Sequence, residues 1–245
     1  MKSKLLLSLL FLYSGFALSE TISIIASRDA TLIEHAMGDL ANGSGPALFA
    51  GRTGQKKASI RRALVYFDLE NVLPPHAKVK RVFLTLHLTP SNAAPAEIAL
   101  YRVKNEWGEG ASFSAGGGGA PAEVGDATWL HAFYTDQFWA LAGGYFVDTP
   151  SATTLVNDTD FYTWQSSRRL VRDVRKWMRH PDRNHGWILV GDESASRTAK
   201  RFDSRESTVE EYRPVLTIEY RLSGRHKFKQ RHRKYLKKFH NYFQH

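Results

Sequence analysis

The fold is decided by the stretch Val79-Lys80-Arg81-Val82-Phe83-Leu84-Thr85-Leu86-His87-Leu88-Thr89. Its even positions from 82 to 88 are all apolar, and its odd positions are mixed. Successive side chains of a strand point to opposite faces, so this period of two predicts a strand with one buried face. Further strands are predicted by similar short segments, at Thr21–Ser27, Thr31–Met37, Ala47–Gly51, Arg61–Leu69, Ile98–Val103, Trp187–Val190 and Val215–Leu222.

Short strands separated by turn residues predict a mainly β chain, a two-sheet antiparallel β-sandwich of jelly-roll type that the last strand closes. One short amphipathic helix is predicted at Ser167–His180, with Ser167 as its N-cap and Pro181 after its end. Its apolar residues recur at helical spacing and should pack against one end or edge of the sandwich. The Gly-rich region Glu106–Trp164, with four glycines at 116–119, predicts a long functional or decorative loop.

The chain divides into three segments. Residues 1–19 resemble a signal peptide, because Lys2 and Lys4 precede an apolar run and a stretch of small residues. We therefore expect a secreted protein, extracellular or periplasmic, with residues 20–222 as its β-sandwich and residues 223–245 as a tail. The tail holds eight Lys and Arg and no acid, and the leader adds two lysines, which together account for the whole net charge of +10. Nucleic acid is therefore not an expected partner of the sandwich.

The tail at residues 223–245 has its own candidate partners. Phe228, Tyr235, Phe239 and Tyr242 recur at spacings of seven, four and three, with basic residues between them. A helix here would be basic and amphipathic, which suits an anionic membrane surface or lipopolysaccharide. A solvated extension without a partner is the alternative.

Several segments together resemble the DNRLRE-domain proteins, an extracellular family that includes alginate-binding carbohydrate-binding modules. The resemblance spans about residues 24–222. The matching segments are Ala26-Ser27-Arg28-Asp29-Ala30-Thr31-Leu32, Leu48-Phe49-Ala50-Gly51-Arg52, Arg62-Ala63-Leu64-Val65-Tyr66-Phe67-Asp68-Leu69, Val82-Phe83-Leu84-Thr85-Leu86 and Pro214-Val215-Leu216-Thr217-Ile218. The resemblance implies a β-sandwich of a secreted or surface protein, with polysaccharide binding as its role.

Candidate ligand residues follow from charge and alternation. In an extended Lys200–Glu206 segment, Arg201, Asp203 and Arg205 share one face, where the guanidinium groups could hold the carboxylates of an acidic sugar. A salt-bridged strand pair is the alternative. Further basic candidates are Arg52, Arg62 and Lys200, and Trp107 and Trp129 are candidates for stacking on sugar rings, unless they fill the core.

The predicted helix repeats arginine at positions 168, 172, 175 and 179, opposite its apolar stripe. Like charges at this spacing repel one another, so an anionic ligand, acidic neighbours or solvent must offset them. Asn157, Asp158 and Asp160 form an oxygen-rich turn that could hold calcium, although a plain turn is the simpler interpretation and no metal or cofactor is expected otherwise.

We expect a non-catalytic module that binds an extracellular polysaccharide, with an acidic polysaccharide favoured over a neutral one. Two alternatives remain: a structural surface, matrix or adhesion protein attached through its tail, and a polysaccharide lyase or hydrolase. Hydrolysis needs two facing carboxylates. The sequence offers Glu109, Glu193, Asp203 and Glu206 for that role.

Overall fold

A computed structural model describes residues 19–90 and 94–222. The predicted leader and tail lie outside the described residues. The predicted fold class is confirmed, because the chain is mainly β, with a large antiparallel sheet, smaller sheets and one α-helix. Among the described residues, no helix has the length and apolarity needed to cross a membrane.

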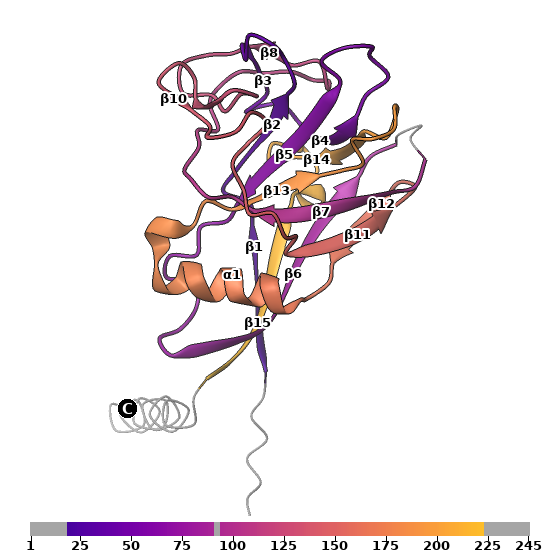
Figure 1. Ribbon diagram of the computed structural model, residues 1–245. Coiled ribbons are helices and arrows are strands. Elements are labelled where there is room, and N and C mark those ends of the chain that lie inside the picture. Colours follow the sequence, from indigo (N-terminus) through magenta and orange to yellow (C-terminus); the bar gives the residue numbers. More distant parts are fainter. Residues whose placement is uncertain (1–18, 91–93, 223–245) are drawn as a thin grey trace, which may run out of the picture.

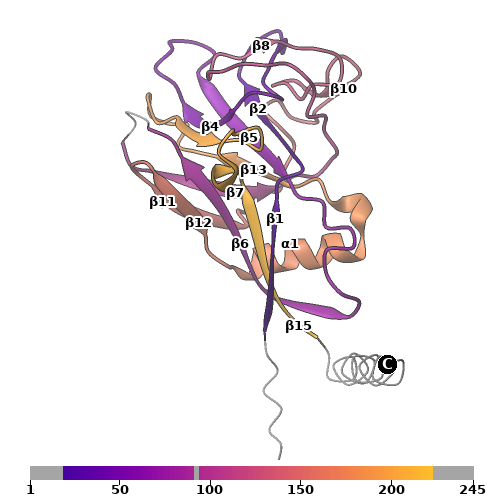
Figure 2. The same ribbon diagram turned by 180° about the vertical axis from the view of Figure 1, so that it is seen from behind.

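The first layer, which we call the open sheet, is built around strand β6 (Ala77–Leu88). The last strand β15 (Val215–Leu222) pairs with β6 on one side and with β1 (Glu20–Ile25) on the other, so the last strand closes this sheet as expected (Figure 2). The upper part of β6 pairs with β12 (Asp160–Trp164) and meets β14 (Lys200–Asp203), which pairs in turn with β4 (Ala47–Arg52).

The second layer, which we call the covered sheet, has the order β2-β5-β13-β7-β11. Its strands are β2 (Arg28–Ile33), β5 (Ile60–Tyr66), β13 (Trp187–Val190), β7 (Ala96–Arg102) and β11 (Ala152–Val156). Strand β4 also pairs with β5 and so joins the two sheets. Buried side chains from both sheets form the main core, including Val82, Leu84, Leu86 and Leu88 of β6.

A second core lies on the other face of the covered sheet. Leu64 of β5 and Ile188 of β13 pack there against Trp107, Ala132 and Trp139. Both faces of the covered sheet are therefore buried, which explains why its strands read as nearly continuous apolar runs instead of alternating ones.

The expectation of a long loop at Glu106–Trp164 holds only in part, because strands interrupt the loop. This region holds β8 (Ala120–Pro121), β9 (His131–Phe133) and β10 (Gln137–Phe138), as well as β11 and β12. Its first part covers the covered sheet, together with the two-residue strand β3 (Leu40–Ala41) that pairs with β8. Three tryptophans of this region are buried, and five of its glycines have a positive φ.

Helix α1 (Arg168–Arg179) lies across the lower part of the molecule beside β6 (Figure 1). The Oγ of Ser167 accepts hydrogen bonds from the backbone N–H of Arg169 and Leu170, which confirms the predicted N-cap. The helix buries Leu170, Val174 and Trp177 in the main core. Two short 3-10 helices, at Pro181–Arg183 and Glu210–Tyr212, follow later in the chain.

Gly51 allows β4 to pass from the open sheet to the covered sheet. Its φ is +115°, and a Cβ at this position would lie 2.8 Å from the carbonyl oxygen of Thr198. A β-branched residue meets both the backbone strain and the clash, so Gly51→Val is expected to lower the free energy of unfolding by about 2–3 kcal/mol. Urea denaturation measures this loss.

Gly116 provides the matched control, because a Cβ there has nothing within 4 Å. Gly116→Ala should change the free energy of unfolding by less than about 0.5 kcal/mol. Equal stabilities of the two variants would show that the conformation of Gly51 is not what turns β4 between the sheets.

Candidate ligand groove

The outer face of the open sheet carries a groove of about 490 Å³ at the end of β4 and β14, which we call the Arg201 groove. It is lined by residues from β4, β5 and β14, from the loop after β4, from the segments that follow β6 and precede β14, and from the Gly-rich region: Phe49, Thr53, Gly54, Gln55, Arg61, Pro90, Gly117, Arg197, Ala199 and Arg201. Its size is within the range of small-molecule sites.

Strand pairing places Arg201 in this groove. Arg201 lies opposite Phe49 in the β14–β4 register, so the two side chains share the outer face. The Nη1 of Arg201 donates to Thr89 Oγ1 at 3.0 Å, and the backbone N–H of Thr89 donates to the Arg201 carbonyl at 2.9 Å. Among the described residues, the Arg201 guanidinium donates only to Thr89 Oγ1. Most of its N–H groups are therefore left for a ligand.

Arg61 builds the groove wall. Its side chain is 2% exposed, and its guanidinium donates to the carbonyls of Gly117 at 2.5 Å and Ala58 at 2.8 Å, and to Gln55 Oε1 at 3.1 Å. Burial lowers the pKa of Arg61 from its ordinary value, and the carboxylate of Glu34 opposes this shift. Arg61 thus fixes two loops while adding positive potential below the groove.

No ion pair within the described part of the chain neutralises the charge of the groove, and the Glu34 carboxylate acts only on the buried Arg61. Arg61, Arg197 and Arg201 form no ion pair there, and no Asp or Glu lines the groove. Arg197 is exposed at the rim. The guanidinium groups of Arg197 and Arg201, which have no carboxylate partner among the described residues, therefore favour an anionic ligand.

An aromatic cluster lies next along the same sheet face. His87 stacks on Tyr212 with 3.7 Å between ring centroids, and its ring also lies 4.8 Å from that of Phe161. Phe161 is 47% exposed, which leaves an aromatic surface for the apolar face of a sugar. Asp203 Oδ2 lies 2.7 Å from Nδ1 of His87, so this carboxylate contacts and positions the His87 ring.

The structure separates the other predicted basic residues from Arg201. Arg62 binds Glu193 through two hydrogen bonds of 2.7 and 2.9 Å, and Arg52 donates to the Glu193 carbonyl at 2.6 Å. Lys200 points to the inner side, is fully buried and donates from Nζ to the Asn157 carbonyl at 3.1 Å. These contacts hold loops and strands together.

The two candidate tryptophans are also placed away from the groove. Trp107 is fully buried in the second core, and its Nε1 donates to the His185 carbonyl at 2.8 Å, so it offers no ring face to a sugar. Trp129 is half-buried, and the guanidinium of Arg62 lies 5.0 Å from its ring.

The turn proposed for calcium is engaged internally. Asn157 Nδ2 donates to Asp158 Oδ2 at 3.1 Å, and Asp160 Oδ1 accepts from the Phe161 N–H at 2.7 Å. Lys200 supplies its ammonium to the same turn. Residues 19–90 and 94–222 contain no cluster of three or more His, Asp or Glu arranged to hold a metal.

Arg205 lies in a separate carboxylate cluster. It binds Glu109 through Nε at 2.6 Å and Nη2 at 2.9 Å, and its Nε lies 2.9 Å from Glu206 Oε1. Its backbone N–H donates to Oδ2 of Asp29 at 2.8 Å. Burial raises the pKa of Asp29 well above its ordinary value, and the nearby Glu206 carboxylate adds to the shift. These contacts connect the end of β14 to the segment around Glu109 and to β2.

The raised pKa of Asp29 gives a pH prediction. A carboxyl whose folded pKa is raised stabilises the fold below its unfolded pKa, and this contribution is lost as pH rises through the folded pKa. Asp29→Asn stays neutral, so its free energy of unfolding relative to wild type should rise with pH above about 4, the ordinary Asp value. Urea unfolding at pH 4 to 8 measures the difference. A difference that falls with pH would mean that Asp29 is stabilised as an ion by Arg205.

Sequence reasoning missed Arg61, Arg197 and Phe49. Arg61 precedes Arg62, which was predicted, and successive side chains of β5 point to opposite faces. The alternation along this predicted strand was therefore the signal that could have identified Arg61. Arg197 lies in a loop without periodicity. A scan against protein-family models and a search of curated proteins both find no match to this chain, so the candidate site rests on its geometry.

Proposed function

We propose that this protein is a secreted, non-catalytic module that binds an acidic polysaccharide in the Arg201 groove. The observation that carries the proposal is the pair of guanidinium groups, those of Arg197 and Arg201, in one open groove with no carboxylate in its lining. Planar guanidinium donors match carboxylate and sulfate oxygens. The exposed aromatic ring of Phe161 on the same sheet face suits the apolar side of a sugar ring.

The internal contacts of the four carboxylates named as candidates for hydrolysis support a binding role over a catalytic one. Glu109 and Glu206 both contact Arg205, Glu193 pairs with Arg62, and Asp203 pairs with His87. Each is held by an internal partner. The resemblance to DNRLRE-domain proteins and the signal-peptide-like leader support the same proposal.

Affinity electrophoresis of the full chain tests this proposal. Gels containing a polyuronate should retard the protein, and gels containing neutral dextran should not. Retardation should weaken as salt rises, because exposed charge pairs are screened. Equal retardation in both gels would contradict recognition of acidic sugars, and the release of shortened or unsaturated products would reveal an enzyme instead.

A further inference from the structure

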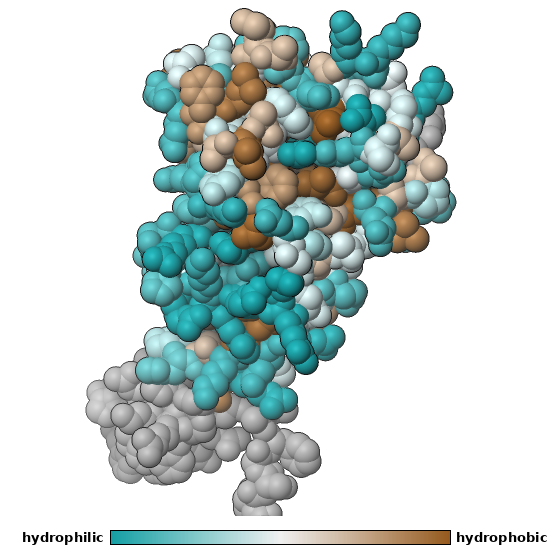
Figure 3. Space-filling model, viewed as in Figure 1, coloured by the Kyte–Doolittle hydropathy of each residue, from teal (hydrophilic) through white to brown (hydrophobic). Residues whose placement is uncertain are grey.

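A second groove, of about 640 Å³, lies between helix α1 and the first residues of β6. We call it the helix groove, and it is lined by Ala77, Lys78, Val79, Lys80, Arg172, Arg175, Met178 and Arg179. The surface around α1 is strongly hydrophilic (Figure 3). The lining of the helix groove includes three of the arginines that repeat along α1. Strand β6 adds two lysines, which the helix pattern did not predict.

The groove exists because one edge of β6 has no strand beside it. On that edge β12 begins to pair only at Leu84, whereas β15 pairs along the opposite edge from Ala77. Arg175 satisfies the free edge by donating from Nε and Nη2 to the Val79 carbonyl, at 3.2 and 2.5 Å. Ser166 Oγ accepts from the Val82 N–H at 3.0 Å. Side chains thus attach the helix at a distance, and a groove remains where a strand would otherwise lie.

Five positively charged side chains line the helix groove. Lys78 and Lys80 are exposed on the strand, and the arginines at 172, 175 and 179 lie on one side of the helix. No Asp or Glu lines the groove, and within the described residues none of these five side chains forms an ion pair. The buried carboxyl of Asp173 interacts electrostatically with Arg172, and solvent or an anionic ligand must offset the rest of the repulsion.

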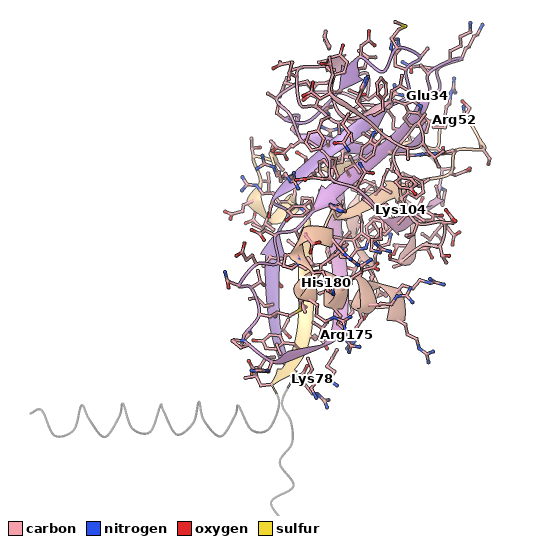
Figure 4. The ribbon with its side chains drawn as sticks, turned by 60° about the vertical axis from the view of Figure 1, so that its left-hand side comes forward. Glu34, Arg52, Lys78, Lys104, Arg175 and His180 are labelled. Atoms are coloured by element: carbon pink, nitrogen blue, oxygen red, sulfur yellow. The ribbon has the colours of Figure 1, made fainter. Side chains whose placement is uncertain are left out.

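The two grooves lie at opposite ends of one strand. Lys80 lines the helix groove and Pro90 lines the Arg201 groove, and ten residues of extended chain span roughly 33 Å. Figure 4 shows the same separation, with Lys78 and Arg175 at one end of the molecule and Arg52, which precedes the groove residue Thr53 in sequence, toward the other. A short oligosaccharide in one groove therefore leaves the other groove free.

We propose that the helix groove is a second, independent site for the anionic groups of an acidic polysaccharide. With the Arg201 groove, and thus resting on the proposed function, it lets one protein molecule hold two polysaccharide segments and cross-link chains. A polysaccharide is favoured over a lipid surface because the cations line a concave groove. In addition, none of the large exposed apolar side chains of the described residues lies on α1 or β6.

The test compares full-length variants that each lose three exposed cations. Lys78→Gln/Lys80→Gln/Arg172→Gln removes charge from the helix groove and keeps Arg175, which attaches the helix. Lys104→Gln/Arg169→Gln/Arg183→Gln makes the same change of charge outside both grooves. Calorimetric titration with a short polyuronate oligosaccharide should give one bound ligand fewer for the first variant than for the second. Light scattering with a long polyuronate should show cross-linked particles for the second variant and far fewer for the first.

Equal ligand numbers for the two variants would overturn the second site. If the first variant instead loses binding to vesicles with phosphatidylglycerol while its polyuronate titration is unchanged, the groove is a lipid site and the proposal fails. Arg197→Gln/Arg201→Gln separates the two claims. If only this variant binds normally, the helix groove stands and the Arg201 groove does not.

Discussion

Arg197→Gln/Arg201→Gln is expected to weaken binding of a polyuronate oligosaccharide at the Arg201 groove by about a hundredfold. Hydrogen bonds to charged groups contribute about 1.5–3 kcal/mol each, and about 1.4 kcal/mol corresponds to a tenfold change in affinity. Both side chains lie at the surface of the groove, and neither forms an ion pair with the described residues, so the fold should survive the change. Calorimetric titration measures the loss, and thermal unfolding checks the fold.

The control for this variant is Lys56→Gln/Lys57→Gln. Both lysines are exposed in the loop that follows β4, close to the groove, but they do not line it. Their removal changes the net charge equally and should weaken binding by less than about threefold, the effect of long-range attraction in salt. A similar loss in both variants would show that the groove contributes only general positive charge.

The largest effect on stability is expected from Trp187→Ala, a loss of about 3–5 kcal/mol in the free energy of unfolding. The Trp187 ring is fully buried, with its centroid 4.4 Å from that of Trp177 and 6.4 Å from that of Phe67. Its Nε1 also donates to Asp173 Oδ2 at 3.2 Å. The substitution therefore leaves a cavity between helix and sheet and removes a partner of a buried carboxyl whose pKa is raised by burial.

Leu141→Ala is the control, because Leu141 is 65% exposed and should cost less than about 0.5 kcal/mol. Denaturant unfolding of both variants gives the comparison. A loss below about 1 kcal/mol for Trp187→Ala would contradict a core shared by α1 and the covered sheet, since removal of a buried aromatic ring costs several times more.

The open sheet could be predicted from the sequence because one of its faces meets solvent. Alternation in β6 marks its buried face directly, and its neighbour Val215–Leu222 was predicted with the bounds that the structure has. In the covered sheet, Trp187–Val190 was also predicted with its bounds, from its short apolar run. Strands β11 and β12 were missed. Thr153 and Thr154 make β11 polar, and its burial is only partial, so hydropathy gives no clear period.

Tertiary contacts explain why the candidate site was only partly predicted. Alternation places Arg201 and Asp203 on the outer face, but β14 ends at Asp203. Arg205 therefore turns away to meet Glu109, which is 96 positions distant in sequence. The second core that buries Trp107 forms between segments far apart in the chain, and a local pattern carries no information about such pairings.

Hydrogen–deuterium exchange of the full chain, with and without a saturating polyuronate oligosaccharide, tests most directly whether the outer sheet face meets the ligand. Peptides covering residues 47–55 and 196–203 should gain protection, whereas β2, in the covered sheet, should exchange as before. Unchanged exchange in both peptides, with protection elsewhere in the sandwich, would contradict ligand binding in the Arg201 groove.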